Sequence, residues 1–330
     1  MPHPMPVDLA SIPARGACTD AERRAAVALH DELRADGHEA WVETHWVRPQ
    51  WAASLLLHAA LGIAASLVST AEDLVVPALA VAAVALVSYA LEVFDGGGLL
   101  RLFFGRATQT VVVEPEDPDA IALLVTASTD VPRRGLLTRV PRARLWVLVA
   151  LALVVAGCAA RVAGAEGNVI GALQFVPTFA LLLAAAGALD VATSDWADAD
   201  DGAVAQAIAV YEDLAARPPE RLSPGLWLTG AGALGMRAQL GAEKRRAQDT
   251  VVLELAGGEG ATWWHTRHPQ IRAAAESVSD PAAVAARRAL AVETIARRAG
   301  LPAAAVGGEE ALDYALALVD ALDAELSASV

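Results

Sequence analysis

The sequence is poor in cysteine, in aromatic residues and in basic residues, and two of these shortages exclude a class of protein. It has only two cysteines, Cys18 and Cys158, so a disulfide-stabilised framework is excluded. Phe, Trp and Tyr make up 5%, and the hydrophobic content of 55% comes largely from Ala, Val and Leu. The 25 Lys and Arg residues are outnumbered by 39 Asp and Glu, which gives a net charge of −14. Without a basic stripe to neutralise phosphates, we expect no nucleic-acid partner.

Charged residues are few or absent in four long stretches, each of the length that crosses a hydrocarbon core of about 30 Å. The stretches are Trp51–Ser69, Leu74–Phe94, Leu145–Ala163 and Val169–Leu189. Short linkers join them in pairs, so the sequence predicts two transmembrane hairpins, at residues 51–94 and 145–189. The first apolar run begins only at residue 51, and we therefore expect no cleavable signal peptide.

Arginine placement predicts the orientation of these hairpins. The two tip linkers have almost no arginine. The segment between the second and third stretches carries seven: Arg101, Arg106, Arg133, Arg134, Arg139, Arg142 and Arg144. By the positive-inside rule, a cell-membrane protein is expected with both termini and the soluble part in the cytoplasm. The five arginines of residues 133–144 should then lie near anionic lipid headgroups.

Alternating strand and helix patterns in the remaining segments predict an α/β fold. A capping-box pattern, Thr19-Asp20-Ala21-Glu22, opens a helix that ends near Gly37. Strands are expected at residues 40–47, 109–114, 121–128, 225–229, 250–255 and 262–266, and helices around 204–214, 280–300 and 309–326. These elements predict a doubly wound, mostly parallel sheet. We expect residues 19–50, 95–144 and 190–330 to form one discontinuous domain, after a flexible N-terminus at residues 1–18.

Five segments, in chain order, resemble those of a known enzyme superfamily. They are Ala127–Asp130, Ala197–Gly202, Leu228–Gly235, Leu253–Gly257 and Gly300–Ala303. Their order is similar to that of the zinc-dependent aminopeptidases of the aminopeptidase Y and glutamate carboxypeptidase type. The family has Gly-His-x-Asp, x-Asp-Asn-Ala-Ser-Gly and Gly-Glu-Glu-x-Gly-Leu-x-Gly motifs at the first three. The resemblance implies a zinc-exopeptidase fold with its site at the carboxyl ends of the strands.

The chain departs from that family at most positions that would hold or use zinc. Ser128 stands where the resemblance implies the first histidine, and Thr229 and Gly230 stand at the general base and the next ligand. Ala256 replaces an aspartate, and no histidine follows His268. Only the bridging Asp198 and the supporting Asp130 are kept. One ligand does not hold zinc, so we interpret the chain as a pseudoenzyme with a vestigial cleft and no cofactor.

Other residues offer weaker alternatives for a site. His265 and His268 flank Thr266-Arg267 and could be ligands or merely solvated loop histidines. A further acidic cluster consists of Asp195, Asp198, Asp200 and Asp201. It could hold Mg²⁺ or Ca²⁺, or its carboxylates could simply stabilise the start of a helix. Gly230-Ala231-Gly232-Ala233-Leu234-Gly235 has the form of a dinucleotide fingerprint but lacks its acidic partner.

The apolar stretches contain few polar residues. His58 is the most unusual of them, and we expect it to pair with Gln174 across a bundle or to act in a proton relay. Glu92 and Asp190 lie near the cytoplasmic ends and should reach water.

Three functions remain open. The first is a non-catalytic membrane protein whose peptidase-like domain is a binding or scaffold module for a protein partner or a second copy. The second is a divergent metallohydrolase that uses Asp130, Asp198 and His265. The third is a regulatory subunit of a membrane transport complex.

Overall fold

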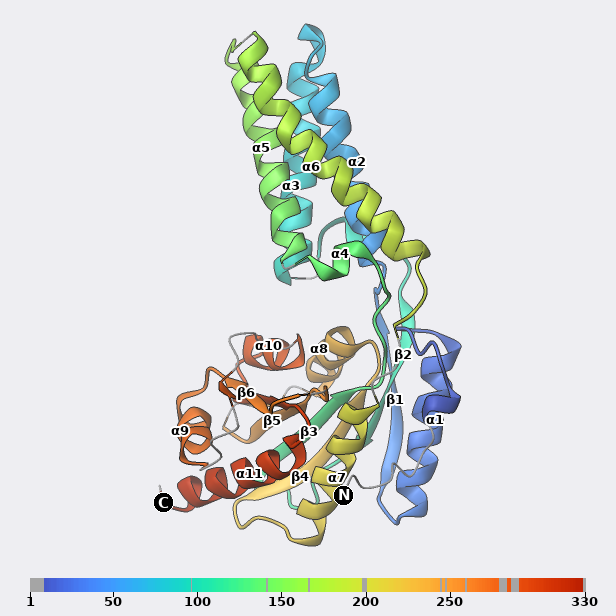
Figure 1. Ribbon diagram of the computed structural model, residues 1–330, viewed down its shortest axis with the longest axis vertical. Helices are drawn as coiled ribbons and strands as arrows, with labels where there is room; N and C mark the ends of the chain where they lie inside the picture. Colours follow the sequence, from blue (N-terminus) through green and yellow to red (C-terminus); the bar gives the residue numbers. More distant parts are fainter. Residues whose placement is uncertain are drawn as a thin grey trace. The chain divides into compact units, whose positions relative to one another are not determined.

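The computed structural model describes residues 9–95, 97–140, 142–165, 167–197, 201–243, 245–246, 248–258, 260–278, 284–285 and 291–328. It divides into two compact units (Figure 1). The α/β unit comprises Met1–Pro49, Arg106–Pro132 and Ala197–Val330, and the helical unit comprises Gln50–Gly105 and Arg133–Trp196.

The α/β unit is built on one eight-stranded sheet of order β1-β2-β4-β3-β5-β8-β6-β7. Its strands are β1 Ala40–Val47, β2 Arg106–Val113, β3 Ile121–Ser128, β4 Leu222–Thr229, β5 Thr250–Leu255, β6 Trp263–Thr266, β7 Val284–Ala285 and β8 Ala303–Gly307. The centre, β4-β3-β5-β8, is parallel, whereas β1 and β2 run antiparallel to their neighbours and β6 runs antiparallel to β8. The α/β class is confirmed, but the sheet is more mixed than expected. The reason is that the first apolar hairpin leaves after β1 and returns beside it, so β2 runs back along β1.

Helices cover both faces of this sheet. On one face, α1 Asp20–Ala35, α7 Gly202–Ala216, α9 Pro269–Ser277 and α11 Ala311–Ala328 bury their apolar sides in a large core. On the other face, α8 Gly232–Glu243 and α10 Ala291–Arg298 cover a smaller core around Trp227 and Val252. Successive strand residues alternate between the two cores, as expected for strands that are buried on both sides.

Several expectations need correction in this unit. The helix expected at 280–300 is present only as α10, and Val284–Ala285 form strand β7 instead, while residues 280–283 and 286–290 lie outside the described part. Residues 9–18, expected as part of a flexible end, pack closely: Leu9–Ser11 form a 3-10 helix, and Leu9 and Arg15 are buried. Residues 1–8 lie outside the described part.

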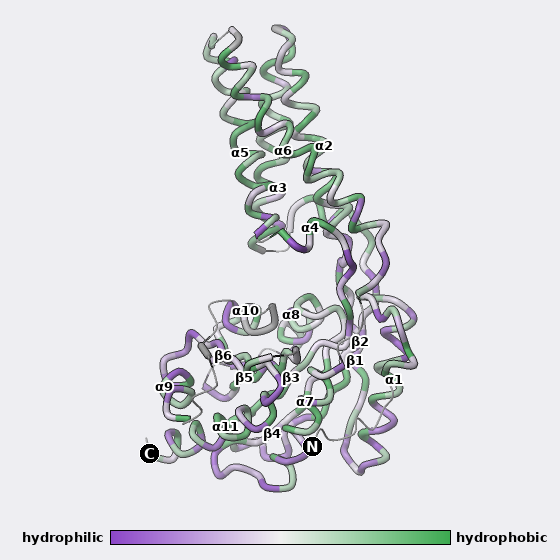
Figure 2. Tube along the Cα trace, in the orientation of Figure 1, coloured by the Kyte–Doolittle hydropathy of each residue, from purple (hydrophilic) through white to green (hydrophobic). Residues whose placement is uncertain are grey.

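The helical unit is a four-helix bundle with short flanking segments. Its long helices are α2 Trp51–Val68, α3 Val75–Asp95, α5 Ala143–Val162 and α6 Asn168–Thr193, and side chains from all four form one core. Each is long and apolar enough to cross a membrane. Large apolar side chains also face outward, among them Val84, Leu153 and Phe175. Figure 2 shows these helices as hydrophobic along most of their length.

The bundle also holds segments that we expected in the α/β domain. The 3-10 helix Gly98–Leu102 packs on α3, where the amide of Leu99 donates to Ser88 Oγ over 2.7 Å. The short helix α4, Leu136–Arg139, lies on α6, where Leu137 contacts Gly187. The remaining 3-10 helix, Glu72–Leu74, forms the tip of the first hairpin.

Candidate active site at the strand ends

The residues of the vestigial cleft meet at the carboxyl ends of β3, β4 and β5. Ser128 lies directly opposite Thr229 in the parallel register, and Ala256 follows β5 on the other side. The Ser128 hydroxyl donates to Asp130 Oδ1 over 2.5 Å, and the amide of Thr129 donates to the Thr229 carbonyl over 3.0 Å. Asp198, the residue that keeps the bridging position, lies outside the described residues.

The glycines after β4 are explained by close packing around a tight strand-to-helix turn. A Cβ on Gly230 would lie 2.3 Å from Glu22 Oε1, and a Cβ on Gly235 would lie 1.9 Å from the Gly230 carbonyl oxygen. Ala231 and Gly232 both have positive φ angles, of 52° and 48°. The G-x-G-x-x-G string is therefore required by the fold itself and gives no support to a dinucleotide site.

Glu22 is a buried carboxylate that sequence reasoning treated only as part of a helix cap. Thr19 does cap α1, but Glu22 accepts instead from the Cys18 amide, from Thr108 Oγ1 over 2.5 Å and from the Gln109 amide over 3.1 Å. Burial raises the pKa of Glu22, and the charge of Asp130 adds to this. Burial also raises the pKa of Asp130 itself.

Cys18, beside Glu22, is a poor nucleophile. Burial and the negative charge of Glu22 raise the pKa of its thiol to about 12, so almost no thiolate exists at neutral pH.

A fixed positive charge lies at the same strand ends. The buried guanidinium of Arg15 donates to the Thr129 carbonyl over 3.2 Å and to the Leu9 carbonyl over 2.6 Å, and it forms an ion pair with Asp201. Asp201 is thus neutralised by Arg15, which corrects its expected place among open cation ligands. Of the other acidic candidates, Asp195 belongs to the helical unit and Asp200 lies outside the described part.

The described donors do not fit the zinc that the resemblance would imply. Zinc sites take three or four ligands from His, Cys, Asp and Glu, and no such group gathers among the described residues. Asp130 is tied to Ser128, and Asp201 is paired with Arg15. His265 lies on β6 opposite Ala305, and burial lowers the pKa of His268.

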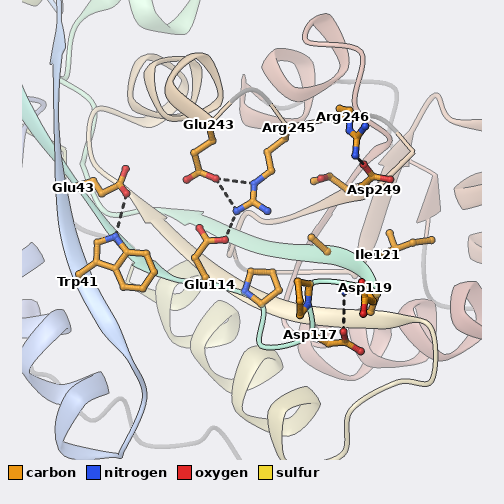
Figure 3. Close-up of a pocket in the computed structure, with 15 residues that line it drawn as sticks. Trp41, Glu43, Glu114, Asp117, Asp119, Ile121, Glu243, Arg245, Arg246 and Asp249 are labelled. Carbon is orange, nitrogen blue, oxygen red and sulfur yellow. Dashed lines mark hydrogen bonds and ion pairs between the residues drawn. The ribbon is translucent and has the colours of Figure 1, made fainter.

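A second hollow opens at the opposite, amino ends of the parallel strands (Figure 3). Its volume is about 780 Å³, and it is lined by the starts of β3 and β5, the end of β2 and parts of β1 and α8. Arg245 lies between Glu114 and Glu243 and forms ion pairs with both, as the dashed lines in Figure 3 show. Glu43 accepts from Trp41 Nε1 and from Gln239 Nε2. Sequence reasoning missed this pocket because its residues come from three separate stretches of the chain, at residues 41–43, 114–122 and 243–250.

The polar residues of the helical unit form two separate groups, and not the expected pair. His58 Nε2 is 2.8 Å from Ser88 Oγ, while His58 Nδ1 is 2.7 Å from the Ser54 carbonyl oxygen and Ser54 Oγ donates to Glu92. Gln174 instead accepts from Arg161 Nε over 2.8 Å and donates to Ser69 Oγ over 2.7 Å. His58 and Gln174 each lie near the start of their helix, and α2 and α6 start at opposite ends of the bundle. Glu92, expected to reach water, is buried.

No protein-family model and no curated protein matches the chain. Among solved structures, it is similar to a zinc aminopeptidase from Bacillus subtilis, at 11% identity and a TM-score of 0.44 over 96% of this chain and 92% of that one. It is also similar to a glutaminyl cyclase from Tannerella forsythia, at 10% identity and a TM-score of 0.40 over 96% and 93% of the two chains. A Zn-dependent exopeptidase from Parabacteroides distasonis gives 9% identity and a TM-score of 0.41 over 97% and 94%. These proteins are of the kind that the sequence resembles.

Proposed function

We propose that this chain is a multi-pass membrane protein whose α/β unit is a non-catalytic binding module on the cytoplasmic side. The observation that carries the proposal is the chemistry of the strand ends. Ser128, Thr229, Gly230 and Ala256 supply neither a general base nor a set of metal ligands, and the buried cation of Arg15 lies beside them.

Membrane attachment is supported by the four long apolar helices and by their outward-facing apolar side chains. A soluble bundle would place charged residues on that outer surface. The arginines between the second and third apolar stretches support a cytoplasmic α/β unit.

The pocket at the amino ends of the strands supports a binding role. Its lining has two arginines, Arg245 and Arg246, and both form ion pairs. It has six acidic residues: Glu43, Glu114, Asp117, Asp119, Glu243 and Asp249. Its excess negative charge favours a basic segment of a protein partner.

Metal content and peptidase activity of the purified full-length chain test the non-catalytic assignment. After incubation with zinc and removal of the excess, we expect less than about a tenth of an equivalent of bound metal, because the strand ends lack a ligand set. We also expect no turnover of aminoacyl or peptide substrates. The rewired hydrolase predicts the opposite, with turnover that falls in Asp130→Asn but not in Asp213→Asn, a partly exposed control on α7 that is paired with Arg217.

Site-specific photo-crosslinking in cells tests the binding role. A photoreactive amino acid at Asp117, in the pocket, should give one discrete crosslinked product, and the same residue at Arg217, exposed directly after α7, should not. A second pair of samples carries Glu43→Lys/Asp119→Lys, which cancels the net negative charge of the pocket lining and should remove the product. Equal crosslinking from both positions would contradict a pocket-specific partner.

The buried His58–Ser54–Glu92 group favours regulation of transport as the second candidate. Buried titratable groups inside a membrane bundle are typical of proton or ion pathways. Proton flux into vesicles that contain the chain, compared between wild type and His58→Phe, would distinguish this role from a scaffold.

A further inference from the structure

The helical unit has an apolar groove between α4, α5 and α6 that is separate from its core. Its volume is about 450 Å³. Its lining combines large apolar side chains, of which Leu136, Trp146 and Leu183 are 67%, 65% and 57% exposed, with small residues such as Ala180, Ala184 and Gly187. The small residues leave space between the large side chains for a narrow apolar chain.

The part of the groove that α4 provides is held firmly in place. The Leu136 amide donates to Asp190 Oδ2 over 2.7 Å, and the backbone of Gly135 lies against Val191 so closely that a Cβ would come within 2.6 Å of it. Asp190 is the one acidic residue in the lining, and this hydrogen bond occupies its carboxylate. The groove is therefore a built feature of the bundle.

Positive charge borders the groove. Residues 133–144 contain five arginines and no acidic residue, in a chain whose net charge is −14. Arg139 and Arg142 directly adjoin the lining residues Val140 and Ala143, and both are exposed. Within the described part of the chain, neither guanidinium forms an ion pair or a hydrogen bond.

We infer that this groove binds one anionic phospholipid, with an acyl chain between α4, α5 and α6 and the phosphate at Arg139 and Arg142. The apolar lining fits a hydrocarbon chain, and the adjoining arginines complement a phosphate, for which their planar guanidinium groups are well suited. Trp146 lies where amphipathic aromatic rings commonly mark the headgroup level. The inference rests on the proposed membrane attachment and adds a specific ligand to it.

The preference should come mainly from the two arginines. A basic residue near an anionic membrane surface improves binding about fivefold, so two should give about thirtyfold. The probe is palmitoyl-oleoyl phosphatidylglycerol, compared with the phosphatidylcholine of the same chains, which has a neutral headgroup.

Native mass spectrometry of the full-length chain in detergent measures this preference. We expect one phosphatidylglycerol to bind at least tenfold more tightly than phosphatidylcholine. Arg139→Gln/Arg142→Gln should reduce the preference to less than threefold. Arg23→Gln/Arg24→Gln, which makes the same charge change on exposed α1, should keep it.

Filling the groove tests the acyl-chain part. Ala180→Trp, at an exposed position in the groove, should weaken the binding of both lipids at least tenfold. Ala152→Trp, exposed on α5 outside the groove, should leave their binding unchanged. Soluble glycerol phosphate should not compete at millimolar concentration.

Three results would overturn the inference: equal binding of the two lipids, equal losses in the control variants, or full competition by glycerol phosphate. Carbonate extraction of membranes distinguishes failure of the lipid-binding inference from failure of the proposed membrane attachment. A chain that resists extraction but shows no lipid preference refutes the groove alone, whereas a chain released by carbonate refutes the membrane proposal.

Discussion

Gly230 lies where three separate parts of the chain meet. Its Cα faces the carboxylate of Glu22 from α1, and the Gln109 carbonyl and the Thr108 hydroxyl from β2 are also within 3 Å of where a Cβ would stand. This contact lets α1 anchor on the sheet through Glu22. At this position glycine serves packing, and its place in a catalytic motif is not needed to explain it.

Gly230→Ala should therefore destabilise the chain by about 1–3 kcal/mol, because the added methyl group has no space among backbone and buried polar atoms. Gly241→Ala is the matched control, since nothing lies within 4 Å of its Cβ position in α8. The control should be neutral or stabilising by up to about 1 kcal/mol. Thermal unfolding of both variants measures the difference, and equal effects would contradict the packing explanation.

Glu22 should make stability depend on pH. Its folded pKa is raised above the unfolded value by burial, so its stabilising contribution is full below the unfolded pKa and is lost as pH rises through the folded pKa. Glu22→Gln lacks this titration and also loses an acceptor for the Cys18 amide, which costs about 1–3 kcal/mol.

The melting temperature of wild type minus that of Glu22→Gln should therefore increase as pH falls from 7.5 to 5. Asp130 is present in both proteins, so the direct effect of its own raised pKa largely cancels in this difference. A difference that stays constant or shrinks toward low pH would contradict the buried-carboxyl interpretation.

At the scale of elements, the apolar strands were the most predictable part of the fold. The runs 40–47, 121–128 and 250–255 match β1, β3 and β5 to the residue, because each is rich in β-branched or aromatic residues. Helix α8 and strand β8 were missed for the opposite reason. Three glycines interrupt the helix formers of the first, and the second reads Ala-Ala-Ala-Val-Gly, so neither sequence reads clearly as its element.

The site was predictable only where strand ends bring residues together. Ser128 and Thr229 follow from parallel pairing. The places of Arg15 and Glu22 in the site could not be predicted, because their partners Thr129 and Thr108 are 114 and 86 residues away. No local pattern encodes such contacts.

The hairpin tips should be outside the cell. In a background with Cys18→Ser and Cys158→Ala, Thr70→Cys and Ala163→Cys should react with a membrane-impermeant maleimide in intact cells, since both positions are exposed at helix ends. Arg217→Cys, directly after α7 where the Arg217 side chain is 75% exposed, should react only after lysis. The reverse pattern would show the opposite orientation.

At the scale of the whole molecule, each of the two helical insertions leaves and re-enters the α/β unit at neighbouring backbone positions. Val47 is the register partner of Arg106, and the amide of Ala197 donates to the Pro132 carbonyl over 2.9 Å. Each insertion thus replaces what could be a tight turn, and the sheet is complete without either.

A chain in which residues 48–105 are replaced by Asn-Gly and residues 133–196 by a short Gly-Ser linker should fold as a soluble monomer. Asn-Gly supplies the tight turn that an antiparallel β1–β2 hairpin prefers. Circular dichroism and amide NMR dispersion measure the outcome. Aggregation of this chain, with recovery when the helices are restored, would show that the α/β unit depends on them.

The strand order also sets a timetable for biosynthesis. Strands β2 and β3 are consecutive in the chain, yet β4 lies between them, and β4 is made only after the last long apolar helix has left the ribosome. Until residue 229 emerges, the nascent chain carries two strand edges that lack their common neighbour, and such edges attract other chains. The long apolar helices are therefore complete before the sheet can close, and during that interval the unfinished domain carries both exposed edges.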